Sequence, residues 1–199
     1  MGKIVISENV TLDGVVEDPT GDEGFRRGGW FGQLKDREEL NRLALEEALT
    51  TEALLFGRRS YEFFGSRWPS RTGPLADRLN TLPKYVVSTT LAAPDWNNST
   101  VVTVDEVAKL REELPGDIVV LASFQLAHTL LEHDLVDELR LKVHPVVLGA
   151  GARLFGGTSD TRPMRLTGTR TLDDGVACLT YERDRDASAI RPDPGRSGG

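Results

Sequence analysis

The stretch from Asp117 to Gly157 constrains the fold of this chain more than any other part of the sequence. It opens with Ile118–Leu121, an apolar, β-branched run that is too short for a helix and is therefore predicted to be a buried strand. Beyond Ala122-Ser123, apolar residues recur at helical spacing, at Leu126, Ala127, Leu130 and Leu131. Apolar and polar residues then alternate strictly from Glu138 to His144, which predicts a second strand. The stretch thus predicts a strand–turn–helix–strand unit, as found in α/β folds.

The Ala122-Ser123 turn is a candidate anion site. It lies where the carboxyl end of a predicted strand meets the amino end of a predicted helix, and Ser123 is expected to cap that helix. Free backbone N–H groups and the helix dipole at such a junction stabilise a negative charge, typically a phosphate. Every strand–helix unit has a turn of this kind and most of them bind nothing, so the turn alone leaves both interpretations open.

The rest of the chain continues the α/β pattern. Short apolar runs predict further strands at Lys3–Val10, Ala53–Phe56, Lys84–Ser88 and Thr100–Val104. Helices are expected over Asp36–Leu49 and, capped by Asp105, over Glu106–Glu113, while Asp173-Asp174-Gly175 predicts a hairpin between Met164–Leu172 and Val176–Arg183. We expect one domain over residues 1–183, with a mixed sheet of about eight strands flanked by helices. Residues 184–199, rich in Pro, Gly and charge, are expected to form a disordered tail.

Composition narrows the classes of partner and compartment. The net charge of −7 weighs against nucleic acid and against an anionic membrane, because both favour an excess of Lys and Arg. The single cysteine, Cys178, excludes an intramolecular disulfide and is expected to be buried and inert. The absence of a long apolar segment and of a signal-like start favours the cytoplasm. The three histidines have no partners at metal-ligand spacing, so no metal site is expected.

Three short motifs at predicted strand ends each allow two interpretations. Asp13-Gly14 forms a good turn by composition. Gly57-Arg58-Arg59-Ser60 offers two guanidiniums that suit phosphate, although paired arginines are usually just exposed surface. The hydroxyls of Ser88-Thr89 suit a ribose phosphate, and they suit an ordinary capped turn equally well.

The polar, glycine-rich loop from Glu17 to Gly32 carries two aromatic residues, Trp30 and Phe31. Exposed aromatic rings are unfavourable, so these two are expected to be buried against something. The sequence does not distinguish a ligand ring from the protein's own core as that neighbour.

The run LVDELRLKVHPVVLGAGARLF, residues 135–155, follows the predicted strand and the small-Ser turn. It resembles the reductase domain of bacterial riboflavin biosynthesis, the C-terminal half of the bifunctional deaminase–reductase, within the dihydrofolate-reductase-like family. Thr11-Leu12-Asp13-Gly14 and Gly57-Arg58-Arg59-Ser60-Tyr61-Glu62 match two further signatures of that family. The resemblance extends over residues 3–183. The chain departs from the family at Ala122, where a glycine is usual and where a methyl group narrows the space for a pyrophosphate.

The resemblance implies a dihydrofolate-reductase-like three-layer αβα sandwich with a central mixed, mostly parallel sheet and a C-terminal β-hairpin, usually as a homodimer. It implies an NADPH-dependent reductase resembling 5-amino-6-(5-phosphoribosylamino)uracil reductase, acting on a pyrimidine, a pterin-like ring or a carbonyl compound. Nothing in the chain resembles the deaminase zinc motif, so a stand-alone reductase is expected.

The resemblance also implies roles for individual residues. NADPH is expected to contact Gly57, Arg58, Arg59, Ser60, Ser88, Thr89, Ala122, Ser123 and Phe124. Asp13 is expected to orient or protonate the substrate, and Trp30 or Phe31 to cover it. Two alternatives stay open. One is a non-catalytic homodimer of the same fold that binds some small ligand or none; the other is a true dihydrofolate reductase, for which Asp36 is a second candidate carboxylate.

Overall fold

The computed structural model describes residues 1–33, 37–156 and 161–187. The strands are β1 (Ile4–Thr11), β2 (Thr51–Gly57), β3 (Lys84–Val87), β4 (Ser99–Val102), β5 (Asp117–Leu121), β6 (Glu138–His144), β7 (Met164–Thr171) and β8 (Ala177–Arg183). The helices are a short 3-10 turn (Trp30–Gln33), α1 (Glu38–Thr50), α2 (Arg58–Gly65), α3 (Pro74–Thr81), α4 (Val104–Glu113) and α5 (Phe124–Glu132). The strands form one eight-stranded sheet in the order β4-β3-β2-β5-β1-β6-β8-β7.

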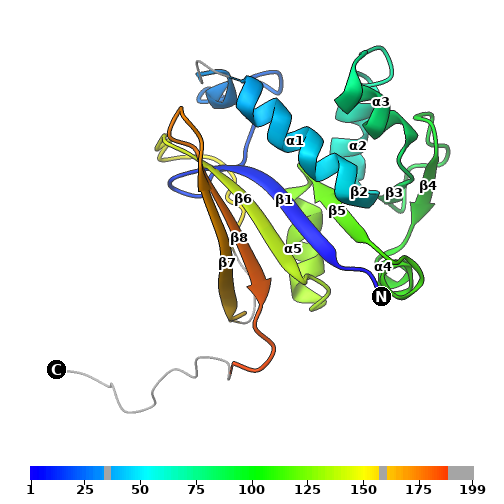
Figure 1. Ribbon diagram of the computed structural model, residues 1–199. Helices are drawn as coiled ribbons and strands as arrows, with labels where there is room; N and C mark the ends of the chain where they lie inside the picture. Colours follow the sequence, from blue (N-terminus) through cyan, green and yellow to red (C-terminus); the bar gives the residue numbers. More distant parts are fainter. Residues whose placement is uncertain (34–36, 157–160, 188–199) are drawn as a thin grey trace.

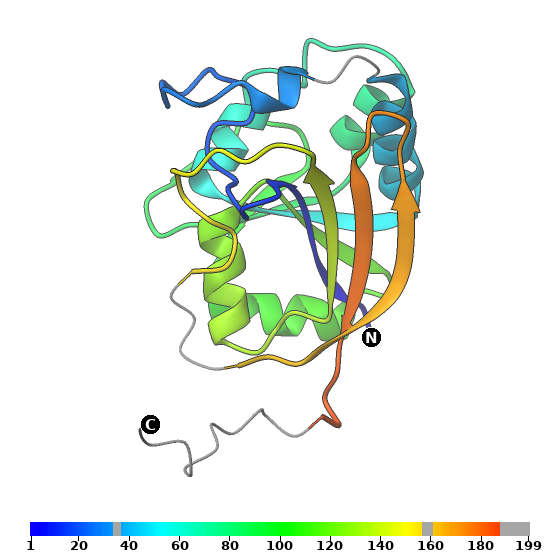
Figure 2. The same cartoon turned by 90° about the vertical axis from the view of Figure 1, so that its left-hand side faces the viewer.

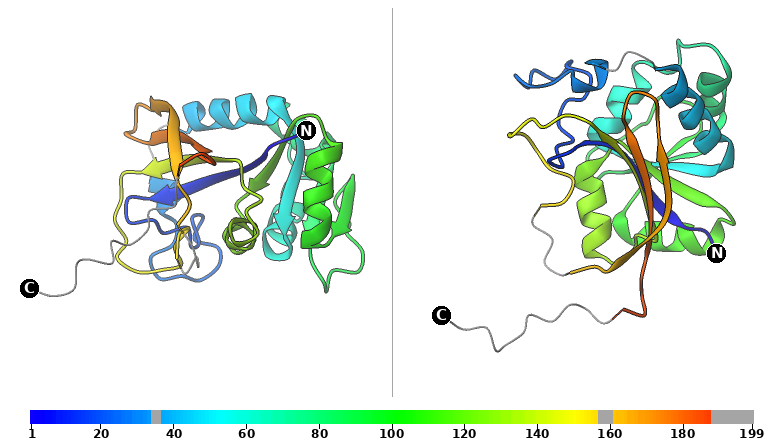
Figure 3. Two further views of the ribbon diagram at one scale, coloured as in Figure 1. Left: turned by 90° about the horizontal axis from the view of Figure 1, so that it is seen from below. Right: turned by 60° about the vertical axis from the view of Figure 1, so that its left-hand side comes forward.

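The sheet is mixed and mostly parallel. Strands β1 to β6 pair in parallel, β8 runs antiparallel to β6, and β7 returns antiparallel to β8. Helices cover both faces, with α1 and α5 on opposite sides of the sheet (Figures 1 and 3). The terminal hairpin lies alongside β6 (Figure 2). These features confirm the predicted three-layer α/β sandwich with a C-terminal hairpin.

The two largest apolar clusters hold the layers together, one on each face of the sheet. Ile4 and Ile6 of β1 belong to the cluster beneath α4 and α5, while Val5 belongs to the cluster beneath α1, α2 and α3. All three side chains are fully buried. A central strand of a parallel sheet is covered on both faces, which explains why these strands are continuously apolar instead of alternating.

The polar side of β6 is an exception to this apolar packing. The strand lies inside the sheet, between β1 and β8, and is not a solvated edge. The Lys142 ammonium donates to the hydroxyl of Ser7 at 2.6 Å and to the carboxylate of Glu47 on α1 at 3.1 Å. Arg140 contacts that same carboxylate at 3.4 Å and pairs with Asp117 at 2.6 Å. The alternation in β6 therefore reflects a polar face that is paired internally beneath α1.

Local details of three segments differ from the sequence-based expectations. Thr103, not Asp105, caps α4, because its hydroxyl and backbone N–H pair reciprocally with Glu106 in a capping box. The described part of α1 begins at Glu38. In the first residues of the expected tail, Arg185 pairs with the carboxylates of Asp134 and Asp137. The remainder of that expected tail, 188–199, lies outside the described residues.

A buried lysine donates hydrogen bonds to three backbone carbonyl groups at the amino end of β3. Lys84 has no solvent-exposed surface. Its ammonium donates to the carbonyl oxygens of Asn80 at 3.1 Å, Leu82 at 2.8 Å and Asn97 at 3.0 Å. The ammonium also lies 4.4 Å from the ring centroid of Trp96. One side chain thus ties the end of α3 to the segment that precedes β4.

Replacing Lys142 by methionine tests the internal ion network. Lys142→Met leaves Glu47, whose side chain is only 13% exposed, without its closest cation, and breaking a buried pair from one side costs about 3–5 kcal/mol of unfolding free energy. The double variant Lys142→Met/Glu47→Leu removes both charges and should recover most of that loss. Urea unfolding of the three proteins measures the effect; equal stabilities for the single and double variants would contradict this account.

Candidate functional site

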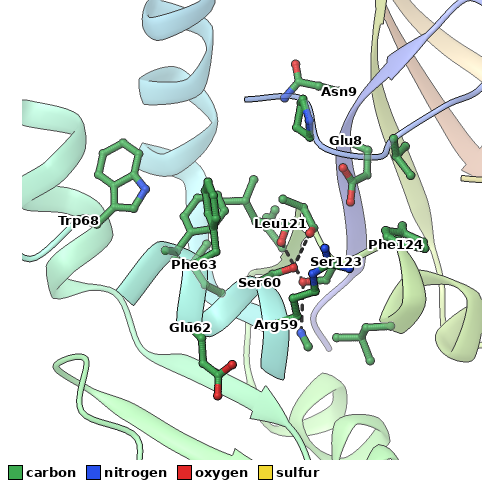
Figure 4. Close-up of a pocket in the computed structure, with 18 of the residues that line it drawn as sticks. Glu8, Asn9, Arg59, Ser60, Glu62, Phe63, Trp68, Leu121, Ser123 and Phe124 are labelled. Atoms are coloured by element: carbon green, nitrogen blue, oxygen red, sulfur yellow. Dashed lines mark hydrogen bonds between the residues drawn. The ribbon is translucent and has the colours of Figure 1, made fainter. Parts of the chain in front are cut away.

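A cavity of about 1220 Å³ opens at the carboxyl ends of the parallel strands. Its wall includes three turns that follow β2, β3 and β5: residues 57–60, 88–90 and 122–124. Parallel strands bring their carboxyl ends to one edge of a sheet, where open α/β folds bind ligands. Figure 4 shows Arg59, Ser60, Ser123 and Phe124 around this space. The nine residues expected to contact a nucleotide all line one cavity.

Side-chain hydrogen bonds join the β5–α5 turn to the β2–α2 turn. The Ser123 hydroxyl donates to the carbonyl of Leu121 at 3.0 Å and accepts from the backbone N–H of Gly57 at 3.1 Å. The Ser60 hydroxyl donates to the carbonyl of Ala122. Ser123 therefore makes no cap to its own helix, contrary to the expectation, because its hydroxyl is used between the turns. The amino ends of α2 and α5 consequently border the cavity side by side.

Ala122 adopts a left-handed backbone conformation with φ +49°. This region suits glycine and disfavours residues with a Cβ atom. The exposed Ala122 methyl group also lies on the cavity wall. Ala122 therefore adopts a backbone conformation that is unfavourable for alanine, at the position where the family usually has glycine.

The guanidiniums of the β2–α2 turn are engaged by neighbouring side chains. Arg58 donates to Glu62 at 2.7 Å and to the hydroxyl of Thr90 at 2.8 Å. Arg59 pairs with Glu23 of the loop that follows β1, at 2.9 Å. The Arg58–Thr90 bond joins the turn after β2 to the turn after β3.

The turn after β3 is capped as ordinary turns are. The Ser88 hydroxyl accepts the backbone N–H groups of Thr90 at 3.2 Å and Leu91 at 3.0 Å. Ser88 and Thr89 nonetheless line the same cavity as the two arginines. The capped-turn and ligand-site interpretations of this motif are therefore compatible.

The two aromatic residues of the first loop have different neighbours. Trp30 is 1% exposed, donates from its indole nitrogen to the carbonyl of Glu17 at 3.0 Å, and packs edge-on against His144. It lies outside the cavity lining, so its ring is buried by protein. Phe31 does line the cavity, and its ring also contacts His144, with the two ring centroids 5.5 Å apart. Of the two, Phe31 alone is placed to meet a ligand.

Asp13 supports a turn instead of facing the cavity. Its carboxylate accepts from the Thr11 hydroxyl at 2.7 Å and from the backbone N–H groups of Leu148 at 3.1 Å and Gly149 at 2.7 Å. The hydroxyl and these amides lower its pKa to about 2. A carboxylate that is ionised at neutral pH has no proton to donate, and Asp13 lies outside the lining of the cavity. Asp36, the second candidate, lies outside the described residues.

Glu8 is a cavity residue that the sequence reasoning missed. It lies on β1, is 5% exposed, and points into the cavity next to Ser123 (Figure 4). Burial raises its pKa to about 8, against the opposing effects of Lys142 and the backbone N–H of Ser123. Its Oε1 atom has no hydrogen-bond partner among the residues that the structure describes. The sequence did contain one indication of this role: Glu8 is an acid within a strand whose apolar run predicts burial on both faces.

The groups on the wall suit a phosphorylated organic ligand. Helix amino ends, hydroxyls and guanidiniums are donors that bind phosphate oxygens. Within the ranges 1–33, 37–156 and 161–187, no group of three or more His, Cys, Asp or Glu side chains could hold a metal ion. Nor does any helix in those ranges have the length and apolar character needed to span a membrane.

The buried acid predicts a pH-dependent stability difference. Because the pKa of Glu8 is raised from 4.5 to about 8, the folded protein keeps a proton that the unfolded chain releases, and wild-type stability falls as pH rises through this window. The Glu8→Gln variant has no carboxyl group at this position, so its free energy of unfolding does not fall in this way as pH rises. We expect the variant to gain on the order of 3 kcal/mol relative to wild type between about pH 5 and pH 9. Urea unfolding at both pH values measures this gain, with Glu112→Gln, an exposed position on α4, as control; a pH-independent difference would contradict burial of a protonated acid.

Comparison with known proteins agrees with this fold. The RibD C-terminal domain family matches residues 2–178. The uncharacterized protein YyaP of Bacillus subtilis (strain 168) is 29% identical over 190 residues, spanning 90% of this chain and 94% of that protein.

Two solved structures share the fold. A protein of Shewanella sp. PV-4 ascribed to riboflavin biosynthesis has a TM-score of 0.72 and 20% identity, covering 92% of this chain and 99% of that one. A pyrimidine reductase-like protein of Corynebacterium diphtheriae has a TM-score of 0.59 and 13% identity, covering 92% of each chain. With the family matching nearly the whole domain, the resemblance drawn from the three motifs is confirmed: this chain belongs to the RibD C-terminal domain family.

Proposed function

We propose that this protein is an NADPH-dependent reductase of the type found in riboflavin biosynthesis. One observation carries the proposal: three strand-end turns, two helix amino ends and two arginines converge on one cavity. The descriptions of the two structural neighbours, pyrimidine reductase-like and ascribed to riboflavin biosynthesis, point to the same class of reaction.

The corner formed by α2 and α5 is the proposed phosphate site. The backbone N–H groups at the start of each helix are available to phosphate oxygens, and Arg58 and Arg59 add charge-assisted donors. Ser88 and Thr89, at the end of β3, are the proposed contacts for the phosphorylated ribose of the adenosine half. When bound, NADPH supplies the hydride for reduction, while the protein supplies position and electrostatics.

The other half of the cavity is the proposed substrate site. It is lined by Glu8 and Asn9 of β1, by Phe31, and by Asn41 and Glu47 of α1. Amide and acid groups beside an aromatic ring suit a flat, polar heterocycle or a carbonyl compound. A pyrimidine such as 5-amino-6-(5-phosphoribosylamino)uracil has this character.

A second candidate, a non-catalytic ligand-binding protein of the same fold, is favoured by one feature. The Ala122 methyl group lies where a pyrophosphate would approach the backbone. Under either candidate, the family resemblance carries the proposal that the chain forms a homodimer, which sedimentation of the full chain tests.

NADPH titration followed by tryptophan fluorescence distinguishes the two candidates. We expect saturable quenching in the micromolar range, and Arg58→Gln should weaken binding about tenfold or more, because a charge-assisted phosphate contact is worth roughly 1.5–3 kcal/mol. Arg42→Gln is the matched control, since this exposed arginine on α1 pairs with Glu39 and Glu46 outside the cavity. A flat response of the wild-type protein at millimolar NADPH would rule out the reductase.

A further inference from the structure

We propose that Glu8 is the acid that protonates the substrate as it is reduced. This assignment rests on the proposed reductase function and adds to it the source of the proton. Three observations support it. Glu8 lies at a particular point of the sheet, its Oε1 atom is buried without a hydrogen-bond partner among the described residues, and the nearby Lys142 ammonium is bonded to other side chains.

Glu8 lies at the point of the sheet where the chain connections diverge. The connection from β1 passes through α1 to β2, beyond β5, whereas the connection from β5 passes through α5 to β6, beyond β1. Neighbouring strands whose connections leave in opposite directions on opposite faces open a crevice between their carboxyl ends. The final pair between them is Ser7 with Leu121, so Glu8 is the first residue of β1 beyond the end of β5.

The Glu8 side chain is buried but incompletely bonded. One carboxyl oxygen is near the backbone N–H of Ser123, while Oε1 has no partner within the described parts of the chain. Buried polar atoms nearly always have a partner in a folded protein. A protonated carboxyl at this position can donate a hydrogen bond to a ligand atom in the cavity.

The charged groups around Glu8 do not neutralise it directly. Lys142, across on β6, is bonded to Ser7 and Glu47. The loop after β1 contributes the acids Glu17 and Asp18, and α2 contributes Arg59, which is paired with Glu23; the facing part of α5 begins with the apolar ring of Phe124. Burial without a dedicated cation favours the neutral acid, in agreement with the raised pKa of about 8.

The reduction of a C=N or C=O bond needs one hydride and one proton. The hydride forms a new C–H bond at the substrate carbon, and the π electron pair moves onto the nitrogen or oxygen. That atom forms a bond to the Glu8 proton, the carboxyl O–H bond breaks, and Glu8 is left as the carboxylate. The cavity opens to solvent, so water returns the proton after the product has left.

The decisive variants are Glu8→Gln, which keeps the size and the hydrogen bonding but cannot give up a proton, and Glu8→Asp, which retains an acid. The probes are NADPH with 5-amino-6-(5-phosphoribosylamino)uracil, and NADPH with dihydrofolate. We expect Glu8→Gln to bind NADPH as wild type does and to lose about 100-fold or more in kcat. Glu8→Asp should restore part of the rate, and the alkaline fall in wild-type kcat should disappear in Glu8→Gln. Glu112→Gln, the exposed control, should behave as wild type.

A second readout needs no turnover. In protein labelled at the glutamate carboxyl carbons, the NMR signal missing from Glu8→Gln should titrate near pH 8. A signal that titrates near 4.5, or a Glu8→Gln variant as fast as wild type, overturns the role of Glu8 and leaves the reductase proposal standing. A wild-type protein that neither binds NADPH nor turns over either probe overturns the reductase proposal, and the assignment of Glu8 with it.

Discussion

The hydroxyl of Ser123 links two of the turns that form the cavity wall. It bridges the carbonyl of Leu121, at the end of β5, and the backbone N–H of Gly57, at the end of β2. With the Ser60 contact to Ala122, this bridge sets the two helix amino ends at a fixed separation. Two strong dipole ends held next to each other and unoccupied by side-chain caps form an electropositive corner. The phosphate site proposed here depends on that corner more than on any single charged residue.

Two carboxylates near the first strand have opposite protonation, and their surroundings explain why. Asp13 is partly exposed and receives three hydrogen bonds, so its pKa falls to about 2. Glu8, five positions earlier, is buried, and desolvation raises its pKa to about 8. Environments that separate the pKa values of similar groups are how one site obtains both an ion and an acid. The family signature pointed to Asp13, but its charge is used to hold the turn at residues 148–149.

The sequence predicted features that are encoded locally. Apolar β-branched runs identified the strands, Asp173-Asp174-Gly175 identified the hairpin, and the motifs that follow β2, β3 and β5 do line one cavity, whereas Asp13-Gly14 does not. Features that depend on distant partners were missed. Ser123 bonds across to Gly57, which lies 66 positions away, and Lys142 reaches Glu47, which lies 95 positions away. Periodicity gives the face of a strand on which a side chain lies, but it does not say what covers that face.

The hydrogen bonds from Lys84 to three backbone carbonyls affect the stability of the end of the sheet opposite the cavity. One buried ammonium bonds carbonyl oxygens of two separate segments, so movement of either segment away from Lys84 would break some of these hydrogen bonds. An arginine does not replace it, since a planar fork cannot point three donors in three directions from one atom. Lys84 therefore stabilises the end of the sheet that lies opposite the cavity, where α3 and the segment before β4 meet.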